Sequence, residues 1–117
     1  MSKDCIKFME MEVFTAANIA VGFKVINADG FPEHMNSLTI TNTMDKSVII
    51  SFDGLYGHEY IPSYKTINIL AQACCSVANR KSLFKNKSKV YVRREGNLPK
   101  GGSVILMGFY QEHPEGD

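Results

Sequence analysis

Apolar and polar residues alternate at every second position in several short runs of this sequence, and this alternation constrains the fold more than any other feature. Leu38 and Ile40 alternate with threonines, and Val90 and Val92 alternate with polar or aromatic residues. Successive side chains of a β-strand point to opposite faces of the sheet, so the pattern is typical of strands with one buried face. We expect strands near residues 7–14, 20–26, 37–41, 47–52, 66–69, 89–93 and 103–110.

Short turn sequences rich in Gly, Pro, Asn and Asp separate these runs, as in Asn27-Ala28-Asp29-Gly30 and Pro99-Lys100-Gly101-Gly102. Many short strands with closely spaced turns favour an all-β fold. With 117 residues, of which 44% are hydrophobic, the chain is long enough for one domain with a core. We predict a single-domain antiparallel β-sandwich (jelly-roll-like) or a small barrel over 1–117, with about 7–8 strands.

Three segments stand apart from this pattern. Residues 1–19 form a candidate N-terminal arm, which either packs on the same domain or reaches into a neighbouring copy, and 111–117 are expected to be a loose tail. Residues 71–79, with Cys74 and Cys75, are rich in small side chains and have no clear period. Charged residues interrupt every candidate signal-peptide core, so we expect the chain to begin at Met1 or Ser2, with reduced thiols.

The last expected strand, 103–110, is apolar on both faces. Val104 and Leu106 fall on one face, and Ile105, Met107 and Phe109 fall on the other. Such a strand either lies in the middle of a buried sheet or has its outer face covered by another chain.

Charge is uneven although the net charge is only +1. Residues 80–100 contain eight basic residues and one acid, whereas the rest of the chain is acidic. This segment has three candidate roles: a nucleic-acid contact, a contact with an acidic protein surface, or a solvated face. The candidate protein-contact residues in it are Arg80, Lys81, Lys85, Lys87, Lys89, Arg93 and Arg94. Replacing both Arg93 and Arg94 by Glu is expected to weaken such a contact without unfolding the domain.

The loop 53–60 supplies further candidates, with Tyr56 and Tyr60 as aromatic anchors and His58 between them. Asp53, His58 and Glu59 are residue types that bind metals or transfer protons, and they are equally typical of a solvated turn. No nucleophile elbow, zinc-protease motif or phosphate-binding loop is present in the sequence. We therefore predict no catalytic, metal or cofactor site.

A series of short motifs extends over roughly residues 20–110. The segments are Asn42-Thr43-Met44-Asp45, Ser51-Phe52-Asp53-Gly54, Tyr60-Ile61-Pro62, Val90-Tyr91-Val92, Gly102-Ser103-Val104 and Phe109-Tyr110. They form a pattern of a strand ending in Asn-x-x-Asp, a strand ending in Ser-Phe-Asp-Gly, an x-x-Pro turn, a Val-Tyr-Val strand and a Gly-Ser-Val strand ending in two aromatic residues. This pattern resembles small structural proteins of tailed bacteriophages.

The resemblance implies a non-enzymatic virion component, made in the host cytoplasm and present in many copies. Its expected partners are other copies of itself and other virion proteins at the neck, tail or head, with no membrane and no cofactor. Two alternatives stay open. One is a receptor- or carbohydrate-binding β-sandwich that uses Tyr56, Tyr60 and Tyr64, and the other is a small nucleic-acid-binding barrel that uses the basic segment.

Overall fold

The computed structural model describes residues 5–32, 34–70 and 87–112. These residues form nine β-strands and one short 3-10 helix, η1. The elements are β1 (Cys5–Phe8), β2 (Glu12–Thr15), η1 (Ala16–Asn18), β3 (Lys24–Val25), β4 (Ser37–Asn42), β5 (Val48–Ser51), β6 (Glu59–Ile61), β7 (Thr66–Leu70), β8 (Tyr91–Arg94) and β9 (Ser103–Glu112).

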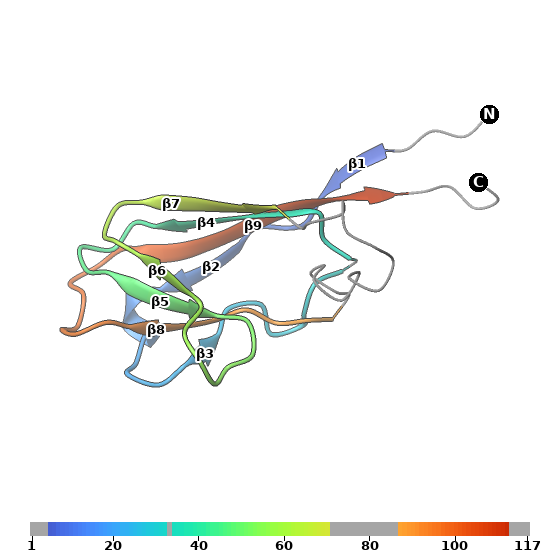
Figure 1. The fold of residues 1–117 in the computed structure, drawn as a ribbon. Coiled ribbons are helices and arrows are strands. Elements are labelled where there is room, and N and C mark those ends of the chain that lie inside the picture. Colours follow the sequence, from blue (N-terminus) through green and yellow to red (C-terminus); the bar gives the residue numbers. More distant parts are fainter. Residues whose placement is uncertain (1–4, 33, 71–86, 113–117) are drawn as a thin grey trace, which may run out of the picture.

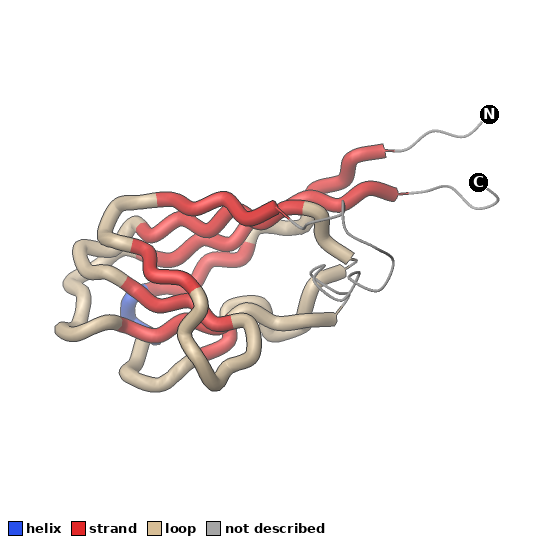
Figure 2. The backbone as a smooth tube through the Cα atoms, viewed as in Figure 1, coloured by secondary structure: helices blue, strands red, loops and turns tan. Residues whose placement is uncertain are grey.

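The strands pair as a set of nested antiparallel pairs. β1 and β2 pair with β9, β3 with β8, β4 with β7, and β5 with β6. Two further pairings, β4 with β9 and β5 with β8, join these pairs into sheets of order β1/β2-β9-β4-β7 and β3-β8-β5-β6. The two sheets lie face to face (Figures 1 and 2). This is the double-sheet jelly-roll arrangement, so the predicted all-β sandwich is confirmed.

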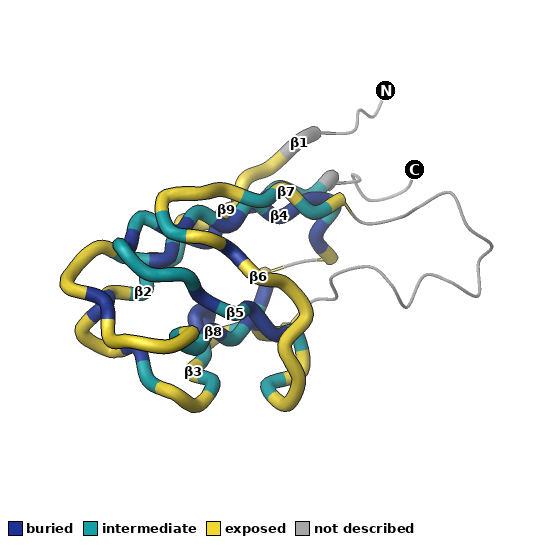
Figure 3. The backbone as a smooth tube through the Cα atoms, turned by 60° about the vertical axis from the view of Figure 1, so that its left-hand side comes forward, coloured by how far each residue is buried: buried dark blue, intermediate teal, exposed yellow. Residues whose placement is uncertain are grey.

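The core lies between the two sheets and is filled by alternate residues of the central strands. Leu38 and Ile40 of β4 face Val48 and Ile50 of β5, and all four side chains are fully buried. Figure 3 shows the buried residues concentrated in the central strands, with exposed loops around them. The alternation seen in the sequence therefore marks the inward faces of these strands correctly.

β1 and β2 form one bulged strand along the edge of β9. Phe8 pairs with Phe109 and Glu12 pairs with Leu106, so the N-terminal side has one residue more than β9 between these two pairs. The Met9 amide still donates to the Gly108 carbonyl at 3.1 Å. An extra residue of this kind is a β-bulge, which shifts the alternation of side chains by one position. The bulge divides the strand expected over 7–14 into two, and together with β6 this brings the strand count to nine, above the predicted seven or eight.

Several boundaries differ from the sequence-based expectation. The strand expected over 20–26 is reduced to β3 (Lys24–Val25), and the expected loop 53–60 ends in β6 (Glu59–Ile61). Residues 5–19 of the candidate arm pack on this domain through β1, β2 and η1. β9 includes Gln111 and Glu112 of the expected tail.

Residues 1–4, 71–86 and 113–117 lie outside the described residues, and with them Cys74 and Cys75. In the described part of the chain, no helix has the length and apolar character that crossing a membrane requires.

Candidate interaction surfaces

The described residues of the basic segment do not share one surface. Arg80, Lys81 and Lys85 lie outside the described residues. Lys87 sits in a turn at a φ of 72°. Arg93 and Arg94 are successive residues of β8, so their side chains point to opposite faces of the sheet.

Arg93 and Arg94 are correspondingly held by different contacts. The Arg93 guanidinium lies 5.4 Å from the centre of the Phe23 ring and donates to Glu95 Oε1 at 3.4 Å, on the outer face of the sheet. The Arg94 Nη1 donates to the Gly96 carbonyl at 2.9 Å, and its Nε is buried without a partner. Arg93 is therefore available to a partner, whereas Arg94 is part of the packing at the end of the sandwich. The expectation that Arg94→Glu leaves the fold intact conflicts with this burial.

The loop 52–58 between β5 and β6 is held together by one carboxylate and one hydroxyl. Asp53 Oδ1 accepts hydrogen bonds from the Leu55 amide at 2.8 Å and the Tyr56 amide at 3.0 Å. It also accepts one from the Ser51 hydroxyl at 2.9 Å, and the Ser51 oxygen in turn accepts one from the Gly54 amide at 2.9 Å. These bonds hold the pKa of Asp53 down to about 2, with the backbone amides of Tyr56 and Leu55 as the main causes.

His58 closes the other side of this loop. Its Nδ1 accepts a hydrogen bond from the Phe52 amide at 3.0 Å, and its ring stacks on the Phe52 ring with centroids 5.6 Å apart. Its Nε2 is 3.8 Å from Asp53 Oδ2. His58 is thus a structural part of the loop. Among the described residues, no three His, Cys, Asp or Glu side chains converge as a metal site.

This rigid loop presents apolar side chains to solvent. Leu55 is 75% exposed and Tyr56 is 71% exposed. Beside them is an open hollow of about 360 Å³, lined by Ile49, Gly57, His58, Glu59, Tyr60 and Arg93. The surface formed by this loop and β6 thus includes the contact candidates Tyr56, His58 and Tyr60, whose role stays a prediction, together with Leu55, which the sequence analysis did not single out.

The outer face of the other sheet carries a stripe of apolar side chains along β9. The outward residues of β9 are Ile105, Met107 and Phe109, and their neighbours across the edge are Val13 and Phe8. The Phe8 and Phe109 rings meet edge to face with centroids 6.2 Å apart. Phe8 is 76% exposed and Met107 is 37% exposed. β9 is thus central in its sheet, as one of the two expectations held, and its outer face is still open to solvent.

The other half of the same face is a ladder of uncharged polar residues on β4 and β7. Thr39 pairs with Asn68 and its hydroxyl donates to the Asn68 side-chain oxygen at 2.7 Å, and the hydroxyls of Thr41 and Thr66 lie 3.0 Å apart. Ser37 and Leu70 complete the outward positions of these two strands. None of the outward side chains at the paired positions of these strands is charged. We call this surface the uncharged face: Phe8, Val13, Thr15, Ser37, Thr39, Thr41, Thr66, Asn68, Leu70, Ser103, Ile105, Met107 and Phe109.

Comparisons with known proteins do not assign a role to these surfaces. No protein-family model matches the sequence, and no curated protein sequence is significantly similar to it. One similar solved structure is described as "Bacillus endospore appendages form a novel family of disulfide-linked pili", with a TM-score of 0.48 and 9% identity, covering 94% of this chain and 89% of that chain. At that identity and TM-score, nothing about function transfers to this chain.

Proposed function

We propose that this chain is a non-enzymatic structural subunit that assembles in many copies, with the uncharged face as a contact between copies. The observation that carries the proposal is the apolar stripe along β9, which leaves Phe8, Val13 and Met107 exposed on a sheet face without charges. A contiguous exposed apolar stripe on a small domain supports an interaction site there.

Charge favours a second copy as the partner. In a two-fold contact the residues near the axis meet their own copies, so a charge there would face a like charge. The uncharged face avoids that repulsion, and a two-fold axis across the strands places the apolar half of one copy against the apolar half of the next.

The size of the face indicates how strong one contact is. Four strands at a spacing of about 4.8 Å, each contributing about 20 Å of length, cover roughly 400 Å² per partner. Stable protein–protein contacts bury about 800 Å² per partner, so one contact of this kind is weak and reversible. Such a contact becomes effective where many copies are held together, since later contacts then form at a high local concentration.

The finer form of the proposal is a component of a tailed-phage virion, at the neck, at the tail or on the head. The sequence resemblance supports it, and a small jelly-roll domain repeated in many copies is compatible with it. In this proposal the chain is made in the host cytoplasm and ends up in the particle. Mass spectrometry of purified particles from the source tests it: a fixed copy number is the expected result, and absence of the chain contradicts the virion assignment.

The self-assembly proposal is tested by sedimentation velocity over a range of protein concentrations. The wild-type chain is expected to associate reversibly, and Met107→Lys to weaken association at least about tenfold, because a lysine would then be buried against its own copy. Tyr60→Lys introduces the same charge on the outer face of the other sheet and serves as the matched control. Equal association of both variants would remove the uncharged face as the contact.

A carbohydrate-binding module is the second candidate function, and one observation favours it. Glu59 and Arg93 bring a hydrogen-bond acceptor and a donor to the same hollow, beside the exposed ring of Tyr60. A sugar hydroxyl is both donor and acceptor, so this set fits a hydroxylated ring. A glycan array probed with the wild type and with Tyr60→Ala tests this candidate, which requires specific binding that the variant loses.

A further inference from the structure

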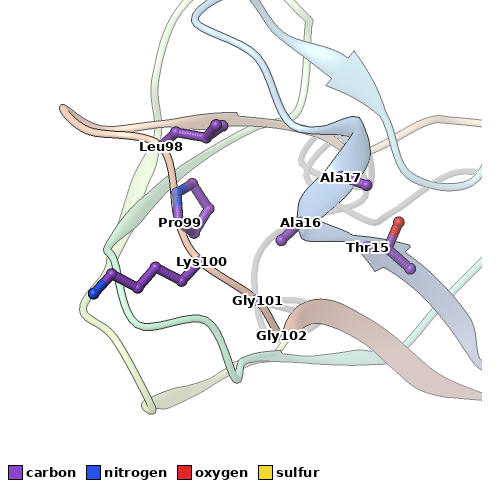
Figure 4. Close-up of a pocket in the computed structure, with 8 residues that line it drawn as sticks. All are labelled: Thr15, Ala16, Ala17, Leu98, Pro99, Lys100, Gly101 and Gly102. Atoms are coloured by element: carbon purple, nitrogen blue, oxygen red, sulfur yellow. The ribbon is translucent and has the colours of Figure 1, made fainter.

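A second hollow lies at the end of the sandwich where β2 ends and β9 begins. Its lining side chains are mostly small or aliphatic. Its volume is about 310 Å³, which equals the volume of about ten water molecules in the liquid. η1 and the end of β2 form one wall, and Leu98 to Gly102 form the other (Figure 4). The lining residues are Thr15, Ala16, Ala17, Leu98, Pro99, Lys100, Gly101 and Gly102. Because Ala16 and Ala17 are short, the space between the walls is open to an incoming side chain.

The walls of this hollow are fixed by hydrogen bonds to the body of the domain. The Ala16 amide donates to the Gly102 carbonyl at 3.0 Å, which ties η1 to the opposite wall. The Lys100 amide donates to Asp45 Oδ1 at 2.8 Å. The Ser103 amide donates to the Thr43 hydroxyl at 2.9 Å. The hollow is therefore preformed, and little ordering is needed to fill it.

The same chain carries a projection that matches such a hollow. Leu55 and Tyr56 are exposed at the tip of the loop 52–58, and the amide of each donates to Asp53 Oδ1. Their backbone is thus held in place before any contact forms, which lowers the entropic cost of docking. An aromatic side chain that enters an apolar hollow is the usual anchor of a protein–protein contact.

The projection and the hollow lie at opposite ends of one strand pair. Val48 of β5 pairs with Arg94, after which the chain continues to Leu98–Gly102, and Ser51 pairs with Tyr91 at the other end, where the loop 52–58 begins. A contact between the loop of one copy and the hollow of another is therefore head to tail. Head-to-tail contacts between unlike surfaces propagate into rings or filaments.

The charges beside the two surfaces are complementary. Lys100 is the charged residue that lines the hollow. Asp53 supports the loop and is ionised at neutral pH, since its pKa is about 2. The Asp45 carboxylate lies outside the lining and accepts hydrogen bonds from the backbone amides of Lys100 and Gly101, which lower its pKa, so it stays ionised and partly offsets the charge of Lys100. A loop that carries Asp53 therefore approaches a hollow whose lining contributes a positive charge.

We propose that Leu55 and Tyr56 of one copy insert into the hollow between η1 and Leu98–Gly102 of the next copy. This inference rests on the proposed function, self-assembly, and names a second contact surface distinct from the uncharged face. The molecule that fills the hollow is a second copy of this chain, because the same chain carries both the projection and a hollow of matching polarity.

The test uses two variants that each lose one side of the contact. Leu55→Asp with Tyr56→Asp removes the projection, and Ala17→Trp fills the hollow at an exposed position. Both are made with Met107→Lys, so that the uncharged face does not contribute. Circular dichroism and dispersed amide NMR spectra establish that each variant is folded.

NMR titrations then separate a head-to-tail contact from any other association. When the ¹⁵N-labelled projection variant is mixed with unlabelled hollow variant, we expect shifts at Thr15–Ala17 and 98–102. With the labels exchanged, the shifts should fall on 53–58, and neither variant should shift when mixed with itself. Tyr64→Asp, at another exposed tyrosine, is the matched control and should behave as the parent. Absence of shifts in the mixed pair at the highest soluble concentration would overturn the inference, whatever the Met107→Lys experiment shows.

Discussion

Asn42 is a buried polar residue whose side chain joins three segments of the chain. Its Nδ2 donates to the carbonyls of Lys46 at 2.9 Å, Pro62 at 3.1 Å and Ile61 at 3.2 Å. Its Oδ1 accepts a hydrogen bond from the Met44 amide at 2.9 Å. One amide group thus satisfies the backbone of the turn after β4 and of the chain after β6, and buried backbone groups of this kind need partners.

Asn42→Ala is expected to destabilise the domain by about 2–4 kcal/mol, because it leaves buried carbonyls and an amide without partners. Asn68→Ala is the control, since Asn68 makes an exposed side-chain bond to Thr39 and should cost less than about 1 kcal/mol. Urea unfolding of both variants measures the difference. Equal losses would contradict the role given to Asn42.

Asp53 gives the loop 52–58 a defined response to acid. Its folded-state pKa of about 2 lies below the ordinary value of 3.8, so its carboxylate stabilises the loop above that ordinary value. This contribution is lost as the pH falls from about 4 through about 2. The amide NMR shifts of Leu55 and Tyr56 should therefore titrate with a midpoint near 2, and should not titrate in Asp53→Asn. A midpoint near 3.8 would show that the two amide bonds to Asp53 do not form.

At the scale of single elements, the start of β9 depends on one glycine. Gly102 has a φ of +96°, and a side chain there would collide with the backbone of Thr43 and Met44. Gly101, its neighbour, has nothing within 4 Å of the place where a Cβ would be. This difference arises because β9 enters the sheet directly against the end of β4.

Gly102→Ala is accordingly expected to cost about 2–4 kcal/mol, from the unfavourable φ together with the backbone collision. Gly101→Ala should change the free energy of unfolding by less than about 1 kcal/mol. Thermal and urea unfolding of the pair measure both values, and the close position of the two residues makes the comparison well matched. A mild effect at Gly102 would mean that β9 can shift its starting point.

Most of the elements that the sequence predicted are those whose alternation was set by burial against the core. β4, β5, β7 and β8 fall in this class, whereas β9 was predicted from a run that is apolar on both faces, and β1 and β2 were predicted as one strand. β6 was missed because its three residues form a strand only through pairing with β5, and two of them are exposed. β3 is shorter than expected because only Lys24 and Val25 pair with β8. Strand formation in these places depends on tertiary context rather than on local pattern.

At the scale of the whole molecule, the uncharged face predicts that association is insensitive to salt. In the Tyr56→Asp variant only this face remains as a proposed contact, and its self-association should stay nearly constant between about 0.05 M and about 0.5 M NaCl, because screening acts on charges. Sulfate should strengthen it, since it favours burial of apolar surface. Sedimentation equilibrium measures both effects. A steep fall with NaCl would instead implicate the basic segment, in a protein or nucleic-acid contact.

The sequence indicated one strand of the uncharged face and could not indicate the rest. The two-sided apolar pattern of 103–110 predicted a strand that lies centrally in its sheet or has its outer face covered by another chain. Phe8 and Val13 join that face only because the bulge between β1 and β2 changes the alternation, and Leu98 meets η1 only through the fold. Surfaces made of segments so far apart in the sequence require the strand register, which no local pattern contains.

The nested pairing of the strands also determines the order in which this chain can fold. β5 and β6 are close in sequence and can pair early, whereas among the described strands β1 and β2 pair only with β9, about 90 or more residues further along the chain. Contacts between such distant segments form slowly. During synthesis the first strands therefore emerge long before the strand that pairs with them. Until β9 is made, their apolar side chains stay exposed to solvent. A chain that ends before β9 consequently lacks the apolar stripe along that strand, so copies of the protein can begin to associate through that face only after β9 has been synthesised.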